Sequence, residues 1–291
     1  MAELRNLGAR SVIARLAEDV KFEHSIFALP FAYLGMILAA RGLPTLPQVL
    51  WITVAMVAAR TLAMSANRLI DRELDARNPR TARRALPTGR LTPRQMLAAS
   101  IASFVVFLFA SAQLNLLCLI LAPIAAVFVV GYSYTKRFSI ASHFILGLSD
   151  AIAPVGGWLA VTGSFAVPPI LLALAVASWI GGFDVIYACQ DVEFDRAEGL
   201  HSIPAEHGIP AALRVSAWMH VFTAVCLLAL WPIAHLGYAY VVGCVIACAL
   251  LYYEHRLVPP DDLSKLGFAF FNLNGYIAVV VFAFTFLGLY V

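Results

Sequence analysis

The sequence predicts an all-α integral membrane protein, a bundle of about nine transmembrane helices that forms one domain over residues 1–291. Composition is the first reason: 62% of the residues are hydrophobic and 13% are charged, whereas soluble domains carry about 25% charged residues. Mean hydropathy is +0.84. The second reason is a series of apolar stretches, each close to the ~20 residues that a spanning helix needs. Such a chain cannot cover its surface with polar groups, so we place it in a membrane.

The apolar stretches are separated by polar connections of unequal length. The first follows a mixed-charge N-terminal segment, 1–23, and the second ends where a long run of charged residues begins. Only the short polar break "AQLN" separates the third stretch from the fourth. The predicted helices lie near 24–41, 47–66, 95–112, 114–132, 143–162, 167–187, 211–231, 235–253 and 268–290.

Basic residues are distributed unevenly among the connections. If the N-terminus is cytoplasmic, the N-terminal segment and the inner connections hold nearly every Lys and Arg, and the outer connections hold only Arg41. The inner connections are then 67–94, 133–142, 188–210 and 254–267. Cytoplasmic connections typically carry an excess of Lys and Arg. The sequence therefore predicts a multi-pass protein of the cytoplasmic (inner) membrane, with a cytoplasmic N-terminus and an outer C-terminus.

Two of the inner connections are long, charged and similar to each other. "DRELDARNPRTARRALPTGRLTP" begins at Asp71, and "DVEFDRAEGLHSIPAEHGIP" begins at Asp191. Both open with Asp-x3-Asp and both contain Pro and Gly before the next apolar stretch. This similarity favours a duplicated half, in which each acid-bearing helix is followed by a cytoplasmic capping loop, 67–94 and 188–210. Chance similarity of two loops is the alternative.

Acidic and polar side chains are regularly spaced around both Asp-x3-Asp motifs. The first set is Asn67, Asp71 and Asp75, and the second set is Asp184, Tyr187, Asp191 and Asp195. Residues four or seven positions apart share one face of a helix. Neighbouring carboxylates on a helix repel, and the cost rises near the membrane, so two such sets indicate a bound cation. Carboxylate oxygens favour Mg²⁺, which typically also binds phosphate oxygens of a substrate.

Basic residues lie among the acids and after the fourth apolar stretch. Arginine suits two-pronged contacts with phosphate, so the combination suggests a diphosphate, and in a membrane protein a diphosphate with a lipid tail. The residues expected to bind this substrate are Lys21, Arg72, Arg80, Arg84 and Lys136, together with Asn67, Asp184 and Tyr187. Anchoring to anionic lipid headgroups is the alternative. It applies chiefly to Arg77, Arg83, Arg90 and Arg94.

Arg60 is a separate signal inside the second apolar stretch. It lies seven residues before Asn67, two turns deeper on the same helix face. A charged residue at the centre of a membrane helix costs about 2.5–3.5 kcal/mol on insertion scales, so a functional partner is expected. A substrate carboxylate that reaches into the bundle would be such a partner. A structural pair with Asp150 or Asp184 is the alternative.

Four stretches together resemble the UbiA superfamily of intramembrane aromatic prenyltransferases. They are "NRLIDRELD", "RTARRALPTG", "YSYTKRF" and "FDVIYACQDVEFD", in the family's order. The resemblance covers roughly residues 20–290, and it is closest to the branch of 4-hydroxybenzoate polyprenyltransferase-like enzymes, some of which belong to the futalosine route to menaquinone. It implies an all-helical fold around a central cavity that opens laterally to lipid, with Mg²⁺ and a prenyl diphosphate between the two acidic motifs.

The resemblance also implies a role for individual positions. It makes Asp71, Asp75, Asp191 and Asp195 the catalytic acids, which hold Mg²⁺ together with Asn67. Arg60 matches the position proposed to bind the carboxylate of the acceptor. One departure concerns the second residue of the first motif, often Asp in the family and Arg68 here. This change alters the local charge but leaves the Asn67, Asp71 and Asp75 triplet intact.

The implied reaction is the Mg²⁺-dependent transfer of a polyprenyl group from polyprenyl diphosphate to an aromatic hydroxy acid, in ubiquinone or menaquinone biosynthesis. Two acceptors stay open, 4-hydroxybenzoate and 1,4-dihydroxy-6-naphthoate. Membrane lipid is an expected partner, and nucleic acid is not.

Within the superfamily, enzymes with haem, chlorophyll or lipid acceptors share the motifs. Outside it, a secondary transporter is the main alternative, although transporter sites lie near the bilayer midplane and these acids gather at one face. A CDP-alcohol phosphotransferase would need Asp-Gly and Ala-Arg ahead of Asp-x3-Asp, and no such set is found.

Overall fold

The computed structural model describes residues 12–20 and 25–291, and within these ranges the protein is helical and has no strands. The long helices are α3 (Ser25–Ala40), α4 (Leu46–Ile70), α6 (Pro93–Leu114), α7 (Leu116–Thr135), α8 (Ser142–Thr162), α9 (Val167–Ala188), α12 (Ile209–Ile233), α13 (Tyr238–Leu257) and α15 (Asn274–Leu287). The short elements are α2 (Val12–Asp19), α5 (Arg72–Arg77), η2 (Cys189–Asp191), α10 (Val192–Glu198), α11 (Ile203–His207), α14 (Leu266–Phe268) and the π-helix η3 (Ala269–Leu273). The all-α prediction is confirmed.

Seven of the helices in the described ranges are long and apolar enough to cross a membrane. Two further apolar helices, Leu29–Ala40 and Asn274–Leu287, are shorter than the usual span. Each predicted apolar segment overlaps one of these helices, but the count of nine spans is not confirmed. The last segment differs most from the prediction, because the π-helix η3 interrupts it just before Asn274. There the Asn274 amide donates to the Ala269 carbonyl at 3.2 Å, a contact that stabilises the wider turn.

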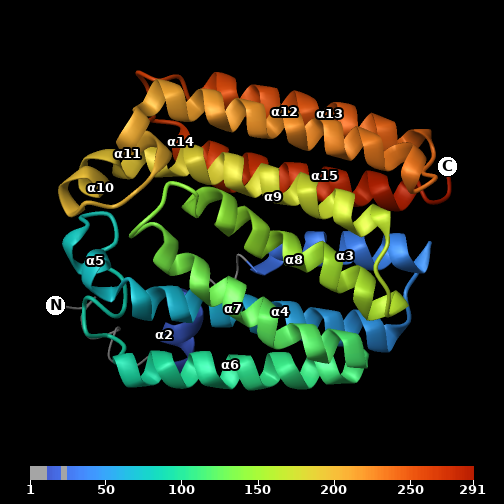
Figure 1. Ribbon diagram of the computed structural model, residues 1–291, viewed down its shortest axis with the longest axis horizontal. Helices are drawn as coiled ribbons and strands as arrows, with labels where there is room; N and C mark the ends of the chain where they lie inside the picture. Colours follow the sequence, from blue (N-terminus) through green and yellow to red (C-terminus); the bar gives the residue numbers. More distant parts are fainter. Residues whose placement is uncertain (1–11, 21–24) are drawn as a thin grey trace.

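The long helices run side by side, with the polar connections gathered at one end (Figure 1). α12 and α13 lie along one side of the bundle, and α6 lies along the opposite side. The short helices α5, α10 and α11 mark the end that we call the connector end, and the C-terminus lies at the other end. We call residues 71–92 the first connector, because they join α4 to α6. Residues 189–208, which join α9 to α12, are the second connector.

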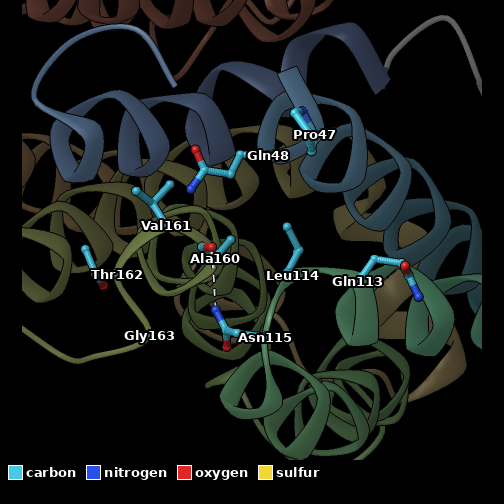
Figure 2. A pocket seen from close by; sticks show the side chains of 9 residues that line it. All are labelled: Pro47, Gln48, Gln113, Leu114, Asn115, Ala160, Val161, Thr162 and Gly163. Carbon is cyan, nitrogen blue, oxygen red and sulfur yellow. Dashed lines mark hydrogen bonds between the residues drawn. The ribbon is translucent and has the colours of Figure 1, made fainter. Parts of the chain in front are cut away.

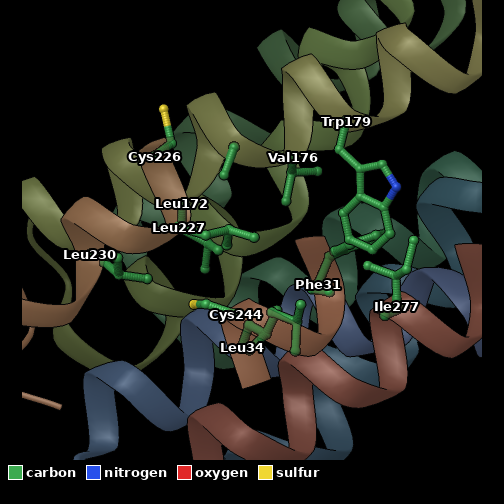
Figure 3. Close-up of a cluster of buried hydrophobic side chains, with 14 of the residues drawn as sticks. Phe31, Leu34, Leu172, Val176, Trp179, Cys226, Leu227, Leu230, Cys244 and Ile277 are labelled. Atoms are coloured by element: carbon green, nitrogen blue, oxygen red, sulfur yellow. The ribbon is translucent and has the colours of Figure 1, made fainter. Parts of the chain in front are cut away.

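The largest apolar core holds α9 against α3, α12, α13 and α15 (Figure 3). Trp179 on α9 belongs to this core, and its ring meets Phe31 of α3 edge to face at a centroid distance of 5.2 Å. The indole N–H of Trp179 donates to the Asn274 side-chain oxygen at 2.6 Å, and the Asn274 amide donates to Glu254 on α13 at 3.0 Å. Apolar packing and a buried polar chain therefore both fix the helix that carries the second acidic motif.

Glycine allows α3 and α8 to approach closely. A Cβ atom on Gly35 would lie 1.9 Å from the Pro154 carbonyl oxygen, and one on Gly157 would lie 2.0 Å from the Ala32 carbonyl oxygen. A Cβ atom on the neighbouring Gly156 would have no atom within 4 Å. Small residues at such crossings let membrane helices pack backbone to backbone.

Both acidic motifs begin where a long helix ends. Asp71 separates α4 from α5 with φ −94° and ψ 4°, and Asp191 precedes α10 with φ −107° and ψ 9°. The expectation of one uninterrupted helix through Asn67, Asp71 and Asp75 is therefore wrong, because the backbone turns at the first aspartate of each motif. Even so, Asp71 N–H donates to the Asn67 carbonyl at 2.9 Å and Asp75 N–H to the Asp71 carbonyl at 2.7 Å. These i to i−4 bonds keep the three side chains on one side.

Candidate active site

Asp71 is the most buried of the four aspartates, with 2% of the residue exposed. Lys136 Nζ lies 2.6 Å from one carboxylate oxygen, and Arg137 Nη2 lies 2.9 Å from the other. The Asn67 amide nitrogen donates to the same carboxylate at 3.0 Å. Lys136 and Arg137 follow the last residue of α7, so two cations from a distant segment balance this buried charge.

Asp75 is held within the first connector. Arg84 Nη1 lies 2.7 Å from one oxygen of the Asp75 carboxylate and 2.8 Å from the other. The Thr81 hydroxyl donates to the Asp75 backbone carbonyl at 3.0 Å. The connector thus folds back on its own acid, and its arginine already faces the motif.

Asp191 joins the two connectors. Arg80 binds it in two-pronged geometry, with Nε donating to Oδ1 at 3.0 Å and Nη2 pairing with Oδ2. Arg80 Nη1 also donates to the Tyr187 hydroxyl at 3.0 Å, and the Asn78 amide donates to Asp191 Oδ1 at 3.0 Å. Burial disfavours the charge on Arg80, but the hydrogen bonding to Asp191 and the electrostatic attraction of Tyr187, Asp191 and Asp75 together outweigh it, so the pKa of the guanidinium is raised above its usual value.

Asp195 and Asp184 are bound by residues that the sequence did not single out. The Ser202 hydroxyl donates to Asp195 at 2.8 Å. His143 Nδ1 lies 2.7 Å from Asp184 Oδ2, and the opposite ring nitrogen accepts from the Ile203 N–H at 3.3 Å. The positive charge of Lys136, which pairs with Asp71, also acts on Asp195. Lys136 is therefore electrostatically linked to both motifs.

The second residue of the first motif, Arg68, is buried, and its charge acts on Asp75 as well as on Asp19. Its Nε lies 3.7 Å from the Asp19 carboxylate at the end of α2. Its Nη1 donates to the Asn67 side-chain oxygen at 3.1 Å. Asn67 therefore presents its amide nitrogen to Asp71, while its oxygen, the atom that would bind a metal, is engaged by Arg68.

Arg60 lies on α4, deeper in the bundle than the aspartates. Its Nε is buried and has no hydrogen-bond partner in the described part of the chain. Its charge acts on Asp150 of α8, but no ion pair within 4 Å joins Arg60 to Asp150 or Asp184 among the described residues. Of the two acids considered from the sequence, Asp184 pairs with His143, whereas Asp150 interacts with Arg60 through its charge without a direct ion pair in the described ranges.

One of the predicted substrate-binding residues, Arg72, is not brought to the aspartates. Arg72 is exposed and pairs with its neighbour Glu73 at 3.3 Å. Lys21 lies outside the described residues. The functional candidates that the sequence reading missed are Asn78, His143 and Ser202. A usable signal existed for His143, since a histidine in the first turn of an apolar helix is unusual.

The donor atoms suit a hard divalent ion, although the side chains are not arranged as a closed metal site. No three His, Cys, Asp or Glu side chains are close enough to hold a metal ion within residues 12–20 and 25–291. The available donors are carboxylate oxygens, the ligands that Mg²⁺ prefers, and Mg²⁺ usually needs only one or two of them when a substrate supplies phosphate oxygens. The residues therefore fit Mg²⁺ bound jointly with a diphosphate.

A cavity of about 300 Å³ lies at the end of the bundle opposite the connectors (Figure 2). It is lined by the start of α4, the junction of α6 and α7, and the end of α8. None of the aspartates or their cations takes part. The lining residues are Pro47, Gln48, Gln113, Leu114, Asn115, Ala160, Val161, Thr162 and Gly163. This cavity is therefore separate from the acidic site.

The family model of the UbiA prenyltransferases matches residues 28–288 of the chain. The chain belongs to the UbiA prenyltransferase family. This UbiA protein is therefore a prenyltransferase with a multi-pass membrane fold, and the transporter and CDP-alcohol phosphotransferase alternatives are set aside.

Its relatives differ in the acceptor named for them. A 4-hydroxybenzoate octaprenyltransferase of Nitrosospira multiformis is 28% identical over 250 residues, which is 86% of this chain and 85% of that protein. A protoheme IX farnesyltransferase of Thioalkalivibrio sulfidiphilus is 29% identical over 263 residues, again 86% and 85% of the two chains. The relatives therefore support prenyl transfer but leave the acceptor open.

Solved structures have the same fold. The apo structure of a UbiA homolog from Aeropyrum pernix K1 is 31% identical, with a TM-score of 0.84 over 91% of this chain and 98% of that one. A UbiA homolog from Archaeoglobus fulgidus, bound to DMAPP and Mg²⁺, has a TM-score of 0.73 over 97% and 100% of the chains at 19% identity. At that identity the second likeness supports the fold alone.

Proposed function

We propose that this UbiA protein transfers a polyprenyl group from polyprenyl diphosphate to an aromatic hydroxy acid, with Mg²⁺ as cofactor. One observation carries the proposal: Asp71, Asp75 and Asp191 each pair with cations at the connector end of the bundle. A diphosphate bound with Mg²⁺ would provide a metal ion for the carboxylates and phosphate oxygens for the cations. The carboxylates can exchange their cations for the metal, and the freed cations can bind phosphate oxygens.

We assign Mg²⁺ binding to Asp71, Asp75, Asp191 and Asp195, with Asn67 beside them. When bound, Mg²⁺ would supply Lewis-acid stabilisation of the charge on the departing pyrophosphate. Asn67 takes part as a ligand only if its amide turns, because its oxygen accepts from Arg68 in the arrangement described.

Arg80, Arg84 and Lys136 are assigned to the diphosphate. Arginine forks bind phosphate oxygens in two-pronged geometry, and Lys136 adds a point charge between the motifs. As the bond between the allylic carbon and the diphosphate oxygen breaks, these cations oppose the growing negative charge. The allylic carbon then bonds to the electron-rich ring, which loses a proton.

The acceptor is assigned to the region of Arg60. About 10 Å separates Arg60 from Asn67 along α4, at 1.5 Å per residue over seven residues. A buried guanidinium nitrogen without a partner is costly, and a carboxylate on the acceptor would satisfy it. This favours an aromatic acid such as 4-hydroxybenzoate or 1,4-dihydroxy-6-naphthoate. The connector end is assigned to the cytoplasm, since its connections hold most of the Lys and Arg.

The direct test is a transfer assay with purified protein. Protein in detergent is incubated with Mg²⁺, a prenyl diphosphate and each of several acceptors, including both aromatic acids and protohaem IX, and products are identified by mass. We expect a prenylated aromatic acid, and no product with excess EDTA. Product from protohaem alone would replace the proposed acceptor, and full activity in EDTA would remove the metal from the mechanism.

Arg60 separates the acceptor assignment from the rest of the proposal. Replacing Arg60 with Ala should raise the KM of the acceptor about 10- to 150-fold, the equivalent of one charge-assisted hydrogen bond of ~1.5–3 kcal/mol. The KM of the prenyl diphosphate should change little. Arg60→Lys should restore only part of the loss, because an ammonium cannot form the two-pronged contact. Unchanged KM values with lower thermal stability would return Arg60 to a structural role.

A further inference from the structure

His143 connects the second connector to an acid inside the bundle, although it belongs to neither. It lies in the first turn of α8, and only 3% of it is exposed. On one side its ring contacts Asp184 of α9 at 2.7 Å, and on the other it contacts the backbone N–H of Ile203 at 3.3 Å. α8 and α9 can come this close because Gly181 has no side chain. A Cβ atom there would lie only 3.0 Å from the His143 carbonyl oxygen.

The two contacts fix the hydrogen on the ring. A backbone N–H can only donate, so Nε2 of His143 must accept from Ile203. The hydrogen of the neutral imidazole then sits on Nδ1, where it donates to the Asp184 carboxylate. If Ile203 moved away, Nε2 would lose its donor, and the ring would no longer be held to the tautomer and orientation that serve Asp184.

The partners of His143 on the connector are themselves tied to the acidic motif. Ile203 is the first residue of α11, and Ser202 precedes it as the helix cap. The Ser202 hydroxyl donates to Asp195 at 2.8 Å. Two consecutive residues at the start of α11 therefore contact Asp195 directly and Asp184 through His143. The placement of α11 and the orientation of both carboxylates depend on each other.

We propose that His143 is a positioning residue that couples the placement of the second connector to the orientation of Asp184. The coupling is reciprocal, as any linkage between two sites must be. A seated connector holds one Asp184 oxygen against His143 and leaves the other for a ligand. In turn, an Asp184 carboxylate that accepts from Nδ1 keeps the ring hydrogen on that nitrogen, so Nε2 stays free to accept from the Ile203 N–H. The inference deepens the proposed function, on which it rests for the role of the aspartates.

Two conservative variants separate the two contacts. His143→Gln places a side-chain oxygen near the position of Nε2, so it can still accept from Ile203 but no longer donates to Asp184 as Nδ1 does. His143→Asn places its amide near the position of Nδ1, so it can still reach Asp184 but not Ile203. A purely structural histidine would be replaced about equally well, or equally badly, by both.

The measurement is hydrogen exchange of the 200–208 segment in the free protein in detergent, with the first connector as an internal reference. His143→Asn should speed exchange at Ile203 about 3- to 10-fold, as expected for one lost neutral hydrogen bond. His143→Gln should keep the protection. Asp184→Ala, which does not touch the connector, should also speed exchange in the wild-type background and should have no effect in the His143→Gln background.

The outcomes distinguish this inference from the proposed function. Exchange at 200–208 that ignores Asp184→Ala, or that responds to it equally in both backgrounds, would overturn the coupling. If neither His143 variant folds, the wild-type and Asp184→Ala pair still decides it. No prenyl transfer is needed for these readouts, whereas failure of the proposed function would appear as absent product in the wild-type transfer assay.

Discussion

The pair of Arg80 and Asp191 should carry a measurable part of the contact between the two connectors. Each of the two hydrogen bonds between them is charge-assisted, a class worth ~1.5–3 kcal/mol when buried. The Arg80 side chain is 34% exposed and that of Asp191 is 15% exposed, so solvent screening reduces this toward the 0–1 kcal/mol typical of surface pairs. Between these limits we expect a coupling energy of about 1–2 kcal/mol.

A double-mutant cycle measures that coupling. The free energy of unfolding is measured in the same detergent for the wild type, Arg80→Ala, Asp191→Ala and the double variant. The coupling energy is the difference between the effect of the double change and the sum of the two single changes. Arg83→Ala is the matched control, since Arg83 is an exposed arginine of the same connector and should change stability by less than about 0.5 kcal/mol. A coupling energy below about 0.3 kcal/mol, the usual scatter of additivity, would refute the tie between the connectors.

The same cycle tests the exchange of partners. If Asp191 binds Mg²⁺ and Arg80 binds a diphosphate, saturating Mg²⁺ and pyrophosphate should lower the direct coupling between them while raising the stability of the wild type. Raised salt alone should weaken the pair only modestly, because partly buried charges are screened less than exposed ones. A coupling that stays constant when pyrophosphate binds would show that the two side chains remain paired and that the cation exchange is incorrect.

Two further predictions concern the packing of the helices. Gly157→Ala should destabilise the protein by about 1–3 kcal/mol, the usual cost of overpacking, because its Cβ would meet a backbone carbonyl at 2.0 Å. Gly156→Ala, one residue earlier in open space, should be near neutral in the same thermal assay, and equal effects would contradict the close-contact explanation. Asn274→Ala should cost about 2–6 kcal/mol, since it leaves both the Trp179 N–H and a Glu254 oxygen buried without this partner, at ~1–3 kcal/mol each. Each kcal/mol is expected to lower the melting temperature by ~2–4 °C. A melting temperature that stays within about 1–2 °C of the wild-type value would therefore show that the polar chain is dispensable.

The fold could be predicted from the sequence because lipid imposes a simple requirement on each helix separately. An apolar stretch must be long enough to span and must satisfy its own backbone, and both properties are local. The acidic residues were predictable for a similar reason, since two Asp-x3-Asp motifs at helix ends are visible without knowing how the helices pack. The break of the helix at Asp71 was not visible, because the i to i−4 hydrogen bonds on both sides of it obey the same spacing.

The partners of the acids could not be predicted, because they come from elsewhere in the chain. Asp71 is paired by Lys136, 65 residues away, and Asp191 by Arg80, 111 residues away. Sequence spacing identifies neighbours on one helix, whereas these contacts depend on which helices lie side by side. His143 was missed for the same reason, since its role exists only where α8, α9 and α11 meet.

The departure at Arg68 changes less at the site than its charge suggests. Arg68 stands where the family often has an acid, so the first motif loses a negative charge and gains a positive one. The gain is balanced locally, because the Asp19 carboxylate lies 3.7 Å from Arg68 Nε and also accepts from the Ala85 N–H of the first connector at 2.8 Å. The extra cation therefore joins α2, the first connector and Asn67, and its charge also acts on Asp75. Its effect on the site is exerted through the orientation of the Asn67 amide and through this charge interaction, whereas the cations that pair directly with the aspartates are Arg80, Arg84, Lys136 and Arg137.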